Sequence, residues 1–102
     1  MAADNLIVLS GRIVEADVPR RTPAGIPILK FRLAHESTQD ELGTPRKVSC
    51  EIAAVAFDRE ARLVSAAPLG SAMTVTGFID RKGHSSRQVI LHAVHIEFET
   101  GD

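Results

Sequence analysis

The stretch Arg20-Arg21-Thr22-Pro23-Ala24-Gly25-Ile26-Pro27-Ile28-Leu29-Lys30-Phe31-Arg32-Leu33 reads as a turn that leads directly into an alternating strand. The two prolines and the glycine exclude a helix and stiffen the start of that strand. Leu29, Phe31 and Leu33 are expected to face a core, and Lys30 and Arg32 to face outward. A positive outer face on a small sheet is typical of proteins that hold a phosphate backbone. Taken alone, the two cations are explained as simply by solvation of an outer face.

Bulk composition limits how such a face could work. The chain has 102 residues, which predicts one domain spanning residues 1–102. Its formal net charge is −1, so an anion-binding surface would have to gather its positive charge locally. Aromatic residues make up only 4% of the chain, with four Phe and no Trp or Tyr. The core is therefore expected to be aliphatic, and a site that stacks bases on many rings is disfavoured.

Cysteine usage and the start of the chain predict a cytoplasmic protein that does not contact a membrane. Cys50 is the single cysteine, which excludes an intramolecular disulfide and a multi-cysteine zinc site. Because Cys50 lies in an alternating run, it is expected to be a small buried hydrophobe. The apolar run from Leu6 to Leu9 is too short for a secretion signal or a membrane span, and no basic segment precedes it.

Five runs have the pattern of strands, and turn-rich segments separate them: Asn5 to Ala16, Pro27 to Glu36, Arg46 to Ala56, Ser71 to Asp80 and Gln88 to Phe98. Gly11, inside the first run, predicts a bulge or a sharp bend. The segment Ser37 to Pro45 is polar and acidic, so we expect a loop there. Asp58 is expected to cap a short helix over Arg59 to Val64.

Three strands, a short helix and two more strands predict an all-β fold, namely a five-stranded OB-fold barrel with the helix between strands 3 and 4. A short sandwich or an SH3-like barrel would give a similar strand count. OB barrels bind oligonucleotides on the face of their second and third strands, framed by the loops between strands 1 and 2 and between strands 4 and 5. The basic residues gather at these places, and this favours nucleic-acid binding: they are Arg20, Arg21, Lys30, Arg32, Arg46, Lys47, Arg81, Lys82 and Arg87.

Motifs spread along nearly the whole chain carry a resemblance to a known family. They are Leu9-Ser10-Gly11, Pro23-Ala24-Gly25-Ile26-Pro27, His35-Glu36-Ser37 with Gln39 and Glu41, Val75-Thr76-Gly77-Phe78-Ile79, Leu91-His92-Ala93 and Gly101-Asp102. Each motif is weak alone, but their order and spacing are specific. In these motifs the chain resembles primosomal replication protein N, the PriB family of bacterial replication restart.

The resemblance implies a homodimer of OB subunits that binds single-stranded DNA without strong sequence preference. It also implies an adaptor role between the restart helicase PriA and a DnaT-type loader protein. The family's basic contacts fall on Arg20 in the first loop and on Arg46 at the start of the third strand. In the hairpin between the fourth and fifth strands they fall on Arg81, Lys82, His84 and Arg87.

Several positions depart from the family pattern. Some members carry stacking aromatics at the positions of Thr44 and Ser49, where this chain could offer only hydroxyl groups. At about 1–3 kcal/mol per stacked base, two missing rings would weaken binding by about a hundredfold or more. Glu15 and Glu36 also place acids where phosphates would pass. Phe78 is the ring that could substitute, although a dimer contact or a place beneath a loop explains it equally well.

Catalytic and metal chemistry find little support in the sequence, and no cofactor is expected. His92 and His95 are three residues apart, which places them on opposite faces of a regular strand unless a bulge re-aims one. His35 and His84 are expected to be polar surface residues. Asp40 and Glu41 lie side by side in the expected acidic loop, which is a poor setting for paired-carboxylate catalysis. We therefore expect a protein that is not an enzyme.

The leading hypothesis is a primosomal adaptor that binds single strands through its cations and binds PriA and DnaT-type proteins through other faces. The alternative is an OB-fold protein-interaction module of the primosome with weak or vestigial binding of single-stranded DNA. The missing rings, Glu15 and Glu36 favour that alternative. A general single-strand-binding protein and a small RNA-binding OB protein are two further possibilities.

Overall fold

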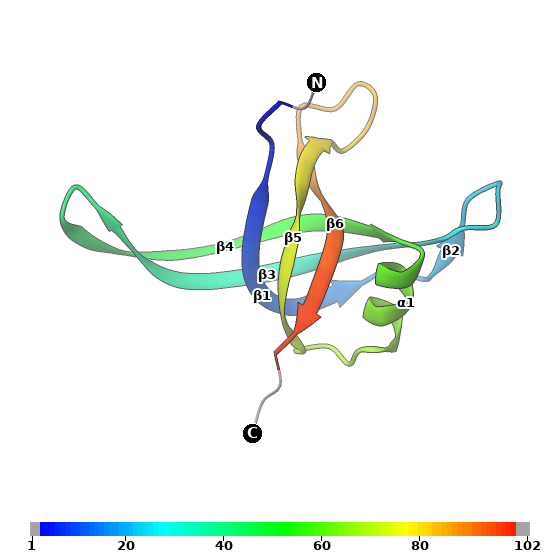
Figure 1. Ribbon diagram of the computed structural model, residues 1–102, viewed down its shortest axis with the longest axis horizontal. Coiled ribbons are helices and arrows are strands. Elements are labelled where there is room, and N and C mark those ends of the chain that lie inside the picture. Colours follow the sequence, from blue (N-terminus) through cyan, green and yellow to red (C-terminus); the bar gives the residue numbers. More distant parts are fainter. Residues whose placement is uncertain (1–2, 100–102) are drawn as a thin grey trace.

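A computed structural model describes residues 3–99 of the chain (Figure 1). Its strands are β1 (Ile7–Ala16), β2 (Arg20–Arg21), β3 (Pro27–Glu41), β4 (Thr44–Phe57), β5 (Ala72–Arg81) and β6 (Val89–Phe98). The helix α1 (Arg59–Ala66) connects β4 to β5. Each of the five expected strands is present, and the two-residue strand β2 is an addition that pairs with the start of β3.

Strands β1, β3, β4, β5 and β6 close into a barrel. The sheet runs in the order β1-β5-β6-β4-β3, and β1 also pairs with β3, which joins the two ends. The pairing of β4 with β6 is parallel, and the other barrel pairings are antiparallel. The helix follows the third of these five strands, so the expected OB-fold barrel is confirmed.

The core of the barrel is aliphatic, as the composition requires. Leu29, Phe31 and Leu33 alternate inward along β3 and are at most 5% exposed, while Lys30 lies exposed on the outer face. Met73 and Val75 on β5 are fully buried opposite them. The helix closes the barrel with Ala61 and Val64, which join the same core cluster. This burial fixes which residues of each strand are left on the outer surface.

Two glycines allow the strands to approach closely. A Cβ atom at Gly11 would lie 2.5 Å from the carbonyl oxygen of Ala34, so β1 can cross β3 only with glycine there. A Cβ at Gly77 would overlap the carbonyl oxygen of His92, beside the register shift between β5 and β6. The bulge expected at Gly11 lies instead between Ile13 and Glu15, where β1 turns from β5 toward β3. Gly11 therefore provides room for the crossing, and the irregularity follows it.

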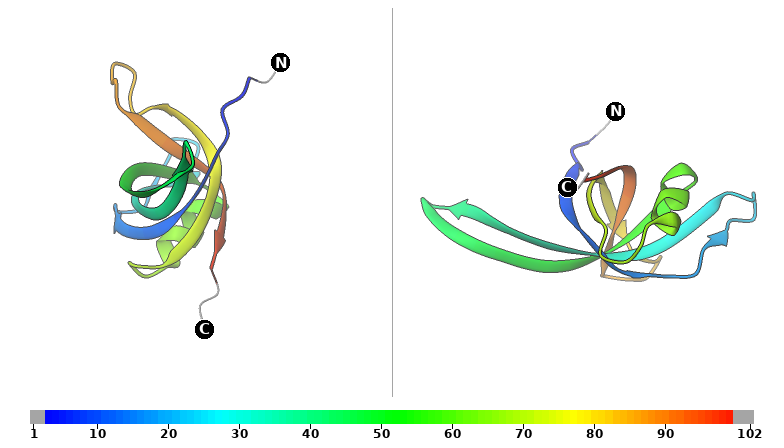
Figure 2. Two further views of the ribbon diagram at one scale, coloured as in Figure 1. Left: turned by 90° about the vertical axis from the view of Figure 1, so that its left-hand side faces the viewer. Right: turned by 90° about the horizontal axis from the view of Figure 1, so that it is seen from below.

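The segment Ser37 to Pro45, which we expected to be a loop, forms strand instead. Strands β3 and β4 pair without interruption from Ile28 with Phe57 to Glu41 with Thr44. The turn between them consists of Leu42 and Gly43, with φ of 54° and 79°, which is typical of a two-residue hairpin turn. We call residues 36–49 the arm. Figure 1 shows it projecting from the barrel on the side opposite β2, and Figure 2 shows the same projection from below.

Three smaller expectations also need correction. Cys50 is exposed rather than buried, because it lies where β3 and β4 leave the barrel. Asp58 occupies the N-cap position, but its carboxylate accepts a hydrogen bond from Arg62 at 3.0 Å instead of capping a backbone N–H. The helix extends two residues beyond Val64, to Ala66.

Within residues 3–99, no helix has both the length and the apolar character needed to span a membrane.

Candidate nucleic-acid interface

Lys30 lies at the centre of a basic surface on the outside of the barrel. With Arg32 from β3 and Lys82 from the β5–β6 loop, it lines a groove of about 250 Å³. The floor of this groove includes Ala53 and Ile90, which lie on β4 and β6. We call this hollow the basic groove. It brings together residues 50 positions apart in the sequence, because β3, β4 and β6 are neighbours in the barrel.

The two arginines of β2 extend the positive surface from the basic groove. Arg20 and Arg21 line an adjoining hollow of about 460 Å³, and Lys30 lines both hollows. The guanidinium of Arg21 donates a hydrogen bond to the carbonyl oxygen of Gly25 at 2.8 Å, which ties the arginine to its own turn. Gly25 has a φ of 84°, a conformation that glycine adopts without strain. The sequence therefore positions these arginines through the Pro23–Pro27 turn.

Acidic side chains neutralise part of this surface. Arg32 lies 3.7 Å from the carboxylate of Glu15 and 4.0 Å from that of Glu51. Asp17 lines both hollows beside Lys30. Ion pairs with this degree of solvent exposure contribute about 0–1 kcal/mol to stability, so an incoming phosphate can compete with the carboxylates for Arg32. Of the two acids that the sequence singled out, Glu15 lies on the basic groove, whereas Glu36 lies at the root of the arm.

Four of the expected site residues lie on the arm, away from the basic groove: Thr44, Arg46, Lys47 and Ser49. All four are exposed. Arg46 forms an ion pair with Glu41 at 3.1 Å across the end of the hairpin. Lys47 pairs in register with Thr38, and Ser49 with Glu36. The arm therefore offers one paired cation, one cation beside a hydroxyl and no ring.

The end of β5 and the β5–β6 loop hold the remaining expected basic residues, Arg81, Lys82, His84 and Arg87, all of them exposed. The loop is closed by a hydrogen bond from the Lys82 N–H to the carbonyl oxygen of Gln88 at 2.7 Å. The Ser86 hydroxyl accepts a hydrogen bond from the Gln88 N–H at 3.0 Å. Lys82 alone among these four lines the basic groove.

Phe78 lies on the outer face of β5 and stacks on another ring. Its centroid is 4.7 Å from that of His92, with an angle of 9° between the planes. Phe57, at the end of β4, is also stacked with His92, with 6.3 Å between the ring centroids and 16° between the planes. We call Phe57, His92 and Phe78 the ring row. The sequence indicated Phe78 only, but the alternation of β4 already places Phe57 on the same outer face as Val55.

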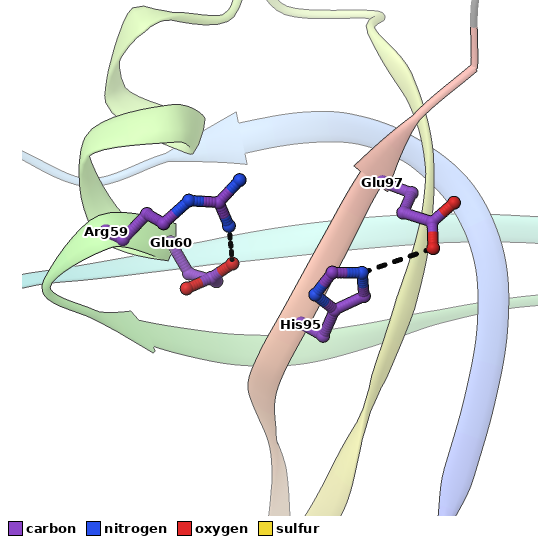
Figure 3. Close-up of polar contacts among 4 residues, drawn as sticks. All are labelled: Arg59, Glu60, His95 and Glu97. Carbon is purple, nitrogen blue, oxygen red and sulfur yellow. Dashed lines mark hydrogen bonds and ion pairs between the residues drawn. The ribbon is translucent and has the colours of Figure 1, made fainter.

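Neighbouring polar groups contact two of the remaining histidines, His35 and His95. His35, expected at the surface, is 8% exposed and hydrogen-bonded to the Ser10 carbonyl and the Ser37 hydroxyl, both at 2.7 Å. His95 pairs with Glu97 at 3.1 Å on β6, and Arg59 with Glu60 on α1 (Figure 3). Across residues 3–99 we find no group of three or more His, Cys, Asp or Glu side chains that could hold a metal ion.

The chain is similar in sequence and in fold to known single-strand-binding and replication restart proteins. The family described as "another single-strand binding protein family" matches residues 5–95. The replication restart protein PriB of Nitrosomonas europaea is 39% identical over 88 residues, covering 86% of this chain and 82% of the relative. PriB of Yersinia pestis is 37% identical over 106 residues, covering all of both chains. The three-dimensional structure of PriB from Ralstonia solanacearum superimposes with a TM-score of 0.87 at 30% identity, covering 96% of this chain and 100% of that one.

Proposed function

The chain belongs to the PriB family of replication restart proteins, and from this premise we propose that it binds single-stranded DNA without sequence preference through its barrel surface. The observation that carries the proposal is the convergence of Arg20, Arg21, Arg32 and Lys82 around Lys30. Basic side chains that follow a groove neutralise backbone phosphates and release counterions, which gives affinity for any sequence. We assign no catalytic step to the protein.

Titration of a labelled poly-dT oligonucleotide at several salt concentrations tests this proposal. For single strands, the plot of log affinity against log salt concentration falls with a slope of about −0.7 per phosphate neutralised. We expect a slope that corresponds to several phosphates. The variant Arg81→Ala/Lys82→Ala should reduce the slope and weaken binding equally for different sequences. Arg59→Gln, a charge-loss control on the helix, should bind like the wild type. A salt-independent or strongly sequence-selective interaction would contradict the proposal.

The same premise suggests a homodimer. Leu6, just before β1, is 73% exposed, and Val8 on the outer face of β1 is 63% exposed. Residues Ile7 to Gly11 of β1 pair with β5, and β1 meets β3 only from Arg12 onward. An apolar strand with one open edge favours pairing with a second copy. Light scattering should then give twice the chain mass of 11.0 kDa, and Val8→Glu should shift the protein toward the monomer.

A second candidate function is a primosomal protein-interaction module with weak DNA binding. The ion pairs of Arg32 and Arg46 favour it, because they reduce the charge available to phosphates. The partners would be a PriA helicase and a DnaT-type protein, in the cytoplasm. Measuring PriA unwinding of a forked substrate with the Arg81→Ala/Lys82→Ala variant separates the two functions. Full stimulation by a variant that no longer binds DNA would favour the module, and lost stimulation would favour DNA binding.

A further inference from the structure

The ring row lies directly beside the basic groove on the outer surface of the barrel. Lys30 pairs in register with Val55, Val55 pairs with His92, and His92 pairs with Phe78. A row of paired residues across β3, β4, β6 and β5 therefore begins at Lys30 and ends at the rings of His92 and Phe78. Along β4 and β6, the floor residues of the basic groove, Ala53 and Ile90, are each two positions before Val55 and His92. Two positions in a strand correspond to about 7 Å.

The ring row borders a second hollow of about 250 Å³, which Val55, Ala93 and Val94 also line. Of the residues that line it, Val55 is 4% exposed and Ala93 5% exposed. The two outer rings remain accessible, with Phe57 at 41% and Phe78 at 38% exposure. The other two phenylalanines of the chain are not exposed in this way: Phe31 is buried, and Phe98 packs against the core. Large apolar side chains that stay exposed next to one another often mark a binding site.

We propose that the ring row is a site for unpaired nucleobases, continuous with the phosphate contacts of the basic groove. The three rings are nearly parallel, so the outward face of Phe57 or of Phe78 can extend the stack by one base. Stacking on a ring tolerates every base, because each base has a π face. The inference rests on the proposed function. It assigns the stacking surface to β4, β5 and β6, instead of the arm positions Thr44 and Ser49.

The test compares a poly-dT oligonucleotide with an abasic oligonucleotide of the same length, which retains the phosphates and lacks the bases. The wild type should bind poly-dT about tenfold more tightly than the abasic strand. The double variant Phe57→Leu/Phe78→Leu should lose this preference and keep the salt slope of the wild type. Phe98→Leu, a ring-loss control on the same strand as His92, should keep the preference.

The outcomes distinguish this inference from the proposed function. If the wild type binds neither strand, the proposed function fails and the ring row loses its ligand as well. If the wild type binds with the expected salt slope but the ring variant still prefers poly-dT, only the ring row is overturned as a base site. Light scattering of the ring variant tests whether the rings belong instead to a subunit interface. Conversion of a dimer to a monomer would assign the rings to the subunit interface and would also overturn the proposal.

Discussion

The arm and the outer face of the barrel are built from the same two strands, yet they offer a ligand different chemistry. On the barrel, Lys30 lines the basic groove, and the ring row lies beside that groove. On the arm, both faces are polar, and Arg46 is already paired with Glu41. The difference follows from burial. Where one face of β3 and β4 covers a core, the other face is held rigid and can position cations and rings, whereas the arm has no core beneath it.

The largest expected effect is a loss of stability, and it comes from comparing a glycine substitution in the barrel with one in the arm. Gly77→Ala places a methyl group against the backbone of His92, and we expect it to cost about 3 kcal/mol or more of unfolding free energy. Gly43→Ala on the arm has open space around it, so only the positive φ of 79° opposes it, at about 1 kcal/mol. Urea unfolding of both variants measures the contrast. Equal stabilities would mean that the approach of β5 to β6 at Gly77 is not tight.

Removing a single cation should likewise reduce the affinity for DNA more on the barrel than on the arm. Lys30→Ala removes a charge that lines both hollows, and we expect about a fivefold loss of affinity for poly-dT and a salt slope smaller by about 0.7. Arg46→Ala removes a cation that Glu41 already neutralises, so its effect should be smaller than twofold. Anisotropy titrations at matched salt measure both. A larger loss for Arg46→Ala would place the main phosphate path on the arm.

A ring can also be added to the arm. Ser49→Trp puts an indole on the exposed part of β4, and if DNA reaches the arm we expect affinity to rise about fivefold. Because the chain has no Trp or Tyr, the new indole is also the dominant fluorophore. Quenching on addition of poly-dT, together with tighter binding, would extend the DNA path along the arm. An unchanged affinity with unquenched emission would confine the path to the barrel.

The smallest expected effect is at the turn of the arm. Leu42 adopts a φ of 54° with a fully exposed side chain, a conformation that Asn tolerates better. Leu42→Asn should therefore stabilise the hairpin by about 0.5–1 kcal/mol. Hydrogen exchange of the arm amides should slow, while exchange in the barrel core stays the same. Faster exchange in the arm would contradict this account of the turn.

The sequence predicted the barrel well because burial leaves an alternating pattern. Leu29, Phe31 and Leu33 were placed inward from that alternation alone, and the structure confirms it. The same rule failed for residues 37–45 of the arm, because a strand with two polar faces reads as a loop. Cys50 was expected to be buried because the alternating pattern of β4 continues past the point where the core ends.

The clustering of basic residues at the candidate site could be predicted from the sequence, and its geometry less so. The turn and strand patterns placed Arg20, Arg21, Lys30, Arg32 and Lys82 near one another, and these five line the two connected hollows. The ring row could not be found in this way. His92 reaches Phe78 through strand register, and Phe57 joins them across the parallel β4–β6 pairing. Contacts of this kind depend on which strands are neighbours, and a one-dimensional pattern does not contain that information.

The exposed position of Cys50 has a practical consequence. It is the single thiol in the chain, it is accessible, and it lies at the root of the arm opposite His35 in register. A maleimide dye would therefore attach at one known position without any substitution. Paired with a dye on an oligonucleotide end, it becomes a spectroscopic ruler that reports the polarity with which a strand lies across the barrel.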